Sequence, residues 1–148
     1  MKKFFNVFIV LVITFTSINV FAKADDIELP RTINRNGKIY EIYEPSRRTN
    51  VAEKSEFSNA TLYSNYRVLA SDVALYVDNS HGHGGDQFAS GYVRATAPHF
   101  TARAEVWKNG RREAGGYDTP NRGDTAYATS HLCVYIDNNR YPRIFYNW

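Results

Sequence analysis

The chain after residue 60 consists largely of strand-length segments in which two kinds of residue alternate. In residues 73–78, Val73, Leu75 and Val77 share one side, while smaller, aromatic or polar residues share the other. Residues 91–97 and 100–107 alternate in the same way. Turn-forming residues separate these segments, and no amphipathic helix is evident after the N-terminal segment. The pattern predicts an all-β fold, an antiparallel β-sandwich of roughly 6–8 short strands.

Other segments extend this prediction. Residues 38–44 alternate and are expected to form a strand after a turn at Asn36-Gly37, and Asn109-Gly110 predicts a hairpin followed by a short edge strand. Residues 46–60 are polar and indicate a loop or linker that allows one helical turn at 52–56. Further strands are expected at residues 126–130, 132–136 and 143–146.

Two features bear on how the strands pack. Ala95, Ala102 and Ala104 are small, and on inward faces they would let two sheets approach closely. Residues 70–79 resemble residues 129–138, since both run from a polar entry through an alternating segment to Asp-Asn. The similarity indicates either pseudo-symmetric strands in facing sheets or two strands that obey the same rules.

The first 22 residues have the features of a cleaved secretory signal peptide. Lys2 and Lys3 precede a nearly uniform apolar stretch over residues 4–15, and small residues follow near residue 22. The alternative, a membrane anchor, needs about 20 apolar residues, more than this stretch provides. We therefore expect residues 1–22 to be the signal, 23–60 an N-terminal strand and polar linker, and 61–148 the β-sandwich domain.

Charge and cysteine content narrow the function. The chain has 18 Lys+Arg and 15 Asp+Glu, and two of the lysines leave with the signal. The near-neutral remainder gives no electrostatic reason to expect a nucleic-acid partner. Cys133 is the only cysteine, so no intramolecular disulfide is possible and packing alone must stabilise the exported domain. No integral membrane segment is expected after signal cleavage.

His81, His83 and Asp86 lie in a glycine-rich segment and are weak candidates for a zinc or copper site. Such a site would suit a small metal-dependent hydrolase, but the spacing matches no standard site, and a solvated hairpin loop has the same composition. Nucleophile-elbow, His-Glu-x-x-His and phosphate-loop motifs are absent. We expect no enzyme activity and no cofactor.

Aromatic residues suggest a contact surface. The chain has 11 tyrosines and two tryptophans. Aromatic side chains contribute strongly to interfaces, although tyrosine also covers half-buried sheet surface. The candidate surface comprises Tyr63, Tyr66, Tyr76, Tyr92 and Trp107.

A series of short motifs runs through the middle of the chain: Leu62-Tyr63-Ser64-Asn65-Tyr66, residues 73–79, the glycine-rich loop at 82–86, residues 91–97 and residues 102–109. In order and spacing, residues 62–109 resemble the lactococcin-like bacteriocin family, and the aromatic end at 145–148 is similar too. Arg67 and Val68 stand where the family usually has histidine or an aromatic residue. The resemblance implies a small exported bacterial β-sandwich without disulfides, acting at the envelope of competing cells, on cell-wall synthesis for example.

The sequence thus predicts a secreted protein, periplasmic in a Gram-negative source, that acts by binding. Its partner would be a cell-envelope component or a protein of another cell, and a homodimer is allowed. The alternative is a secreted or periplasmic interaction module that recognises carbohydrate, peptide or a partner protein.

Overall fold

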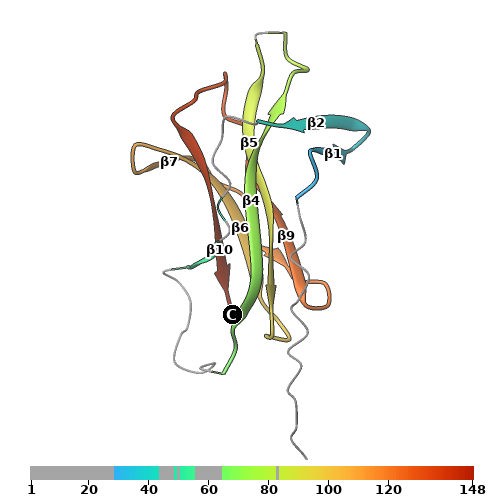
Figure 1. Ribbon diagram of the computed structural model, residues 1–148, viewed down its shortest axis with the longest axis vertical. Helices are drawn as coiled ribbons and strands as arrows, with labels where there is room; N and C mark the ends of the chain where they lie inside the picture. Colours follow the sequence, from blue (N-terminus) through green and yellow to red (C-terminus); the bar gives the residue numbers. More distant parts are fainter. Residues whose placement is uncertain (1–28, 44–48, 50, 56–64, 83) are drawn as a thin grey trace, which may run out of the picture.

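The computed structural model describes residues 29–43, 49, 51–55, 65–82 and 84–148, which form strands and loops without a helix (Figure 1). One sheet has the order β1-β2-β4-β5-β9, with strands Thr32–Arg35, Lys38–Ile42, Val68–Asp78, Asp86–Ala95 and Thr125–Thr129. The other has the order β3-β10-β6-β7, with strands Glu53–Lys54, Arg140–Asn147, Thr101–Lys108 and Arg111–Ala114, and β8 (Thr119–Pro120) pairs with β6. The predicted all-β sandwich is confirmed.

The proposed signal peptide lies outside the described residues. Within the described residues, no helix is long and apolar enough to span a bilayer.

Two tight turns form where the sequence places Asn-Gly. Asn36 and Gly37 have φ values of 53° and 82°, and Asn109 and Gly110 have φ values of 49° and 76°. Positive φ at both central residues is the requirement of a type I′ turn, which asparagine and glycine tolerate. These turns connect β1 to β2 and β6 to β7. The sequence predicts the β6–β7 hairpin, whereas at Asn36-Gly37 it predicts the turn and the strand after it but not β1.

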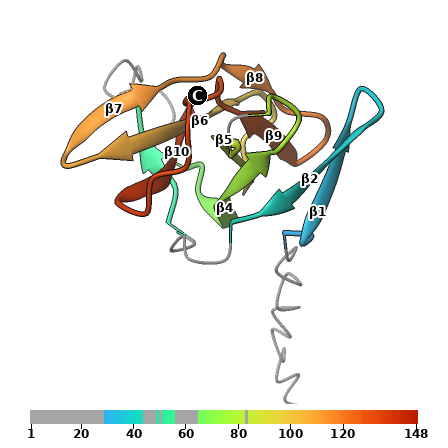
Figure 2. The same cartoon turned by 90° about the horizontal axis from the view of Figure 1, so that it is seen from above.

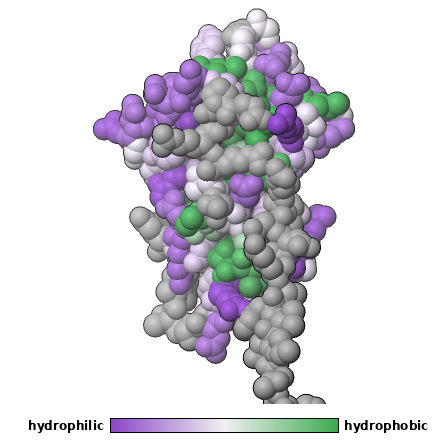
Figure 3. Space-filling model, viewed as in Figure 1, coloured by the Kyte–Doolittle hydropathy of each residue, from purple (hydrophilic) through white to green (hydrophobic). Residues whose placement is uncertain are grey.

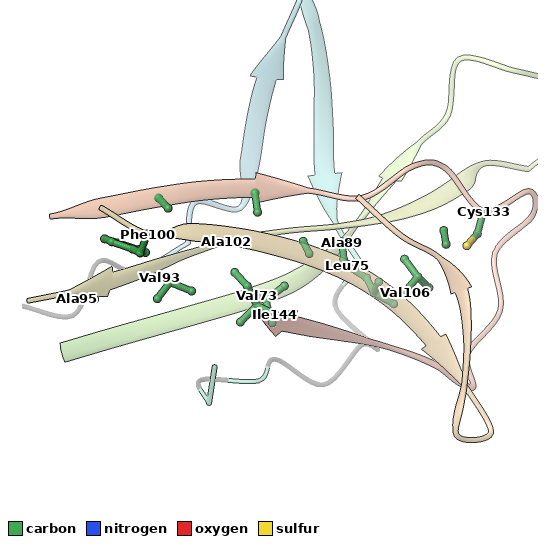
Figure 4. Packing of buried hydrophobic residues seen from close by; sticks show 14 of the residues in the cluster. Val73, Leu75, Ala89, Val93, Ala95, Phe100, Ala102, Val106, Cys133 and Ile144 are labelled. Carbon is green, nitrogen blue, oxygen red and sulfur yellow. The ribbon is translucent and has the colours of Figure 1, made fainter. Parts of the chain in front are cut away.

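The inner faces of the two sheets form the main core. Val73, Leu75 and Val93 of the first sheet belong to one buried cluster with residues of the second sheet, including Val106 and Ile144 (Figure 4). The three alanines expected on inward faces, Ala95, Ala102 and Ala104, are all within this cluster. Their small side chains allow the close approach of the sheets.

The outer face of the first sheet is also covered over β4 and β5, whereas Tyr127 of β9 remains exposed. The β1–β2 hairpin extends from the edge of β4 (Figure 2), and its side chains pack on the outward residues of β4 and β5. Tyr40 of the hairpin lies edge-on to Phe88, with ring centroids 5.1 Å apart, and Phe88 stacks on Tyr76 at 5.8 Å. The Tyr76 hydroxyl donates a hydrogen bond to the Pro30 carbonyl at 3.0 Å. Both faces of β4 are therefore buried.

Segments before residue 61 belong to the sandwich. β2 pairs with β4 in the first sheet, and β3 pairs in parallel with β10 in the second. The predicted boundary at residue 60 therefore does not separate a linker from the fold. Glu53 and Lys54 form a strand where the sequence also allows a helical turn, because the edge of β10 is available for pairing.

The expected strand at residues 132–136 does not form. Only Cys133 pairs there: its amide donates to the Gln87 carbonyl over 2.7 Å, and its carbonyl accepts from the Gln87 amide over 2.9 Å. Tyr135 has φ of 62°, which breaks the extended conformation. Arg140 donates to the carbonyls of Val134 and Tyr135 and so stabilises the irregular path. The similarity of residues 129–138 to 70–79 therefore reflects neither symmetric strands nor two strands of one kind.

Candidate functional site

The structure separates the residues of the predicted contact surface. Tyr76 and Tyr92 are buried, with exposed fractions of 0% and 1%, which corrects their assignment to a surface. They belong to the cluster beneath the β1–β2 hairpin. Alternation along one strand cannot show that a distant hairpin covers its outward side chains. Tyr66 is half-buried against the aromatic C-terminus, and Tyr63 lies outside the described residues. Of the four described residues, only Trp107 lies on the outer face of the second sheet, where it is half-buried.

The described residues of the glycine-rich loop form a polar network. Nδ1 of His81 lies 2.9 Å from Asp86 and 3.9 Å from Asp78, while His83 is outside the described residues. Asp86 also accepts a hydrogen bond from the Tyr135 amide at 3.1 Å. No group of three metal-ligating side chains occurs in the described part of the chain. Through Asp86, the described residues of this loop therefore help to position Tyr135.

A ladder of charged and aromatic side chains crosses the outer face of the second sheet. β6 pairs with β10 so that Arg103 lies opposite Phe145 and Glu105 opposite Arg143. Trp107 lies opposite Arg112 of β7 in the adjoining pair. Directly opposed residues on one face of an antiparallel pair are close enough to interact, so the register itself assembles this ladder.

A buried carboxylate lies at the centre of the ladder. Glu105 is 2% exposed, and it accepts hydrogen bonds from the Trp107 indole at 2.7 Å and from Arg112 at 3.3 Å. Nε of Arg103 is 3.0 Å from Glu105 but is not aligned to donate, and it has no hydrogen-bond partner among the described residues. A buried charge needs such partners, because an unpaired one carries a large desolvation cost.

Arg143 joins the aromatic side chains to the edge of the sheet. Its guanidinium lies 4.1 Å from the Trp107 ring centroid and 4.8 Å from that of Phe145. Two of its nitrogens donate to Glu53 of β3, one of them over 2.6 Å. This pairing raises the pKa of Arg143 above its usual value, since it favours the charged form. Glu53 thereby holds the flat, positively charged guanidinium of Arg143 over the Trp107 and Phe145 rings.

These side chains border a recess of about 360 Å³, which we call the arginine groove. It is lined by Ser55, Arg103, Glu105, Trp107, Arg112, Arg143 and Phe145. The volume is within the usual range of small-ligand sites. Elsewhere, on the face shown in Figure 3, hydrophobic residues form separate patches between hydrophilic ones.

Most residues of the arginine groove were not predicted as site residues. The alternation of residues 100–107 puts Arg103, Glu105 and Trp107 on one face, but of these only Trp107 belongs to the predicted contact surface. The same alternation continues through β10, where Arg143 and Phe145 are two residues apart. The same arginine–aromatic alternation in two segments was the signal in the sequence for this groove, but it identifies a site only once β10 is known to pair with β6.

Comparison with protein-family models, curated proteins and solved structures finds no match to this chain. The geometry of the arginine groove is therefore the basis for assigning a function.

Proposed function

We propose that the protein is an exported recognition module that acts by binding, and that the arginine groove is its recognition site. The observation that carries this proposal is the convergence of three arginines and two aromatic rings on one recess of an outer sheet face. A solvated sheet face needs neither feature to be stable, whereas aromatic and arginine side chains contribute the most energy to recognition surfaces. A carbohydrate, a peptide or a protein loop would fit such a groove.

Trp107 provides a direct test. Phenylalanine at position 148 (Trp148→Phe) leaves Trp107 as the only tryptophan, since the chain has two. Titration with a panel of neutral and acidic glycans, peptidoglycan fragments and peptides should shift or quench its emission in a saturable manner for at least one ligand.

Two further variants locate the binding. Phe145→Ala removes a groove ring and should weaken the response at least tenfold, because aromatic contacts are common binding hot spots. Tyr117→Ala removes a ring that is 76% exposed and outside the groove, and it should have no effect. An unchanged emission spectrum with every ligand of the panel would contradict the proposal.

A bacteriocin-like antagonist of competing cells is the second candidate. It is supported by the resemblance of residues 62–109 together with a β-sandwich that has no disulfide, the fold that the resemblance implies. Purified protein applied to lawns of related and unrelated bacteria should produce zones of inhibition, and Phe145→Ala should reduce them if the arginine groove contacts the target. The absence of inhibition on all strains at high dose would count against this role.

A further inference from the structure

Hydrogen-bond donors outnumber acceptors in the arginine groove. Each guanidinium carries five N–H donors and no acceptor. Glu105 accepts from Arg112 and Trp107, and Glu53 accepts from Arg143. Arg103 lies 3.0 Å from Glu105 without donating to it, and among the described residues it donates only to Asp118 at the margin, over 3.5 Å. Most N–H groups of Arg103 and Arg112 therefore have no acceptor in the described part of the protein.

The charges are also separated by depth. The Glu105 side chain is 2% exposed, whereas those of Arg103 and Arg112 are 21% and 57% exposed. A ligand that enters from solvent therefore meets the two guanidinium groups before the carboxylate beneath them. Arg143 contributes less, because Glu53 already occupies two of its nitrogens.

The aromatic rings restrict the body of the ligand. Phe145 is half-buried beside Arg103, with its ring centroid 5.8 Å from that guanidinium. An oxyanion held by Arg103 and Arg112 thus has an apolar ring within reach of the group to which it is attached. The apolar face of a sugar ring suits this position better than a flexible chain, because less conformational freedom is lost on binding.

We propose that the arginine groove binds an acidic saccharide, whose carboxylate or sulfate oxygens accept hydrogen bonds from Arg103 and Arg112 while its ring packs on Phe145. Guanidinium groups match such oxyanions with paired, charge-assisted hydrogen bonds. This inference rests on the proposed function and specifies its ligand class.

The test is calorimetric titration of the unmodified protein with four probes. They are an oligogalacturonate decamer, a heparin decasaccharide, a neutral maltodecaose and inorganic sulfate. At least one of the two acidic saccharides should bind, and it should bind at least tenfold more tightly than maltodecaose or sulfate. The comparison of the two acidic probes shows whether the oxyanion is a carboxylate or a sulfate.

A matched pair of variants locates the contact. Arg112→Gln should weaken binding of the acidic saccharide about tenfold, the loss of one charge-assisted contact. Arg111→Gln makes the same change of charge on the neighbouring residue, which is exposed and outside the groove, and should weaken it less than about twofold. Equal losses in the two variants would overturn the inference, because they would indicate general attraction to the basic hairpin.

The outcomes separate this inference from the proposed function. If maltodecaose binds as tightly as the acidic saccharides and Phe145→Ala weakens that binding, the groove remains a recognition site but is not specific for acidic ligands. Sulfate that binds as tightly as heparin would replace the saccharide with a simple anion. If no probe binds and the Trp107 panel is also silent, both the inference and the proposed function fail.

Discussion

The outward aromatic side chains of the two sheets differ in burial. On the first sheet, Tyr76, Phe88 and Tyr92 point outward and are buried beneath the β1–β2 hairpin. On the second sheet, Trp107 and Phe145 point outward and remain half-buried among arginines around an open recess. Aromatic side chains on an outer face therefore contribute to a second core in one sheet and to a candidate binding site in the other.

Charge distinguishes the two faces as clearly as cover does. The cluster under the hairpin consists of apolar and tyrosine side chains, and the one guanidinium that lies over it among the described residues is that of Arg35, 5.7 Å from the Phe88 ring centroid. The second sheet instead has a buried carboxylate with arginines above it, which makes burial by a hairpin costly, because the charges would lose contact with water. The following predictions test this contrast, from the largest expected effect to the smallest.

Truncation beneath the hairpin should have the largest effect. Phe88 is 2% exposed and contacts both Tyr40 and Tyr76. Phe88→Ala should lower the free energy of unfolding by about 3–5 kcal/mol, measured by urea denaturation, because it leaves a cavity in packed surroundings. Tyr117→Ala, at a residue 76% exposed, is the control and should change it by less than about 0.5 kcal/mol. A small loss for Phe88→Ala would mean that the hairpin does not cover this face in solution.

Removal of the buried charge should have the next largest effect. Glu105→Gln keeps the shape but weakens the hydrogen bonds from Trp107 and Arg112, and should cost about 1.5–3 kcal/mol. Asp118→Asn changes a carboxylate that is 53% exposed and 3.5 Å from Arg103, so it should be nearly neutral. If both variants prove equally mild, Glu105 does not organise the outer face.

Replacement of the flat cation should have a smaller effect. Arg143→Lys keeps the charge but cannot pair with both oxygens of Glu53 or stack as a plane on Trp107. The expected loss is about 0.5–1 kcal/mol by urea denaturation. Trp107 emission should also shift, because the group above the indole has changed. An unaltered spectrum would contradict the stacked arrangement.

Acid should destabilise the protein through surface carboxylates that belong to neither face. Hydrogen bonds from Arg94 and Lys108 hold the pKa values of Asp124 and Asp137, respectively, below their ordinary value of 3.8. Around and below the ordinary pKa, the unfolded chain therefore binds more protons than the folded protein. The stability that these two carboxylates contribute is present above the ordinary pKa and is lost as the pH falls through the lower pKa values of the folded state. The urea midpoint should drop between pH 6 and pH 3, and less so in Asp124→Asn. An equal drop in that variant would mean that Asp124 plays no part.

Local sequence was sufficient to predict part of this fold. The alternation of Val73 and Leu75, the small residues Ala102 and Ala104 and the two Asn-Gly turns are properties of neighbouring residues, and the structure confirms the predicted fold from them. The burial of Tyr76 could not be predicted from its own strand, because the side chains that cover it belong to the β1–β2 hairpin, which is distant in the sequence.

The candidate site depends on pairing between distant segments. Glu53 and Arg143 are 90 residues apart, and only the parallel pairing of β3 with β10 brings them together. Residues 132–136 had the composition of a strand, but Gln87 and Arg140 stabilise a different path there. In both regions tertiary contacts overrode or completed the local pattern.

The position of β10 also sets an order of events in time. β10 lies between β3 and β6 in the second sheet, although among the described strands it is the last to be synthesised. The ribosome releases β3 and β6 long before the strand that must separate them exists, so neither the sheet nor the arginine groove can form on a partial chain. Non-local pairing of this kind slows folding.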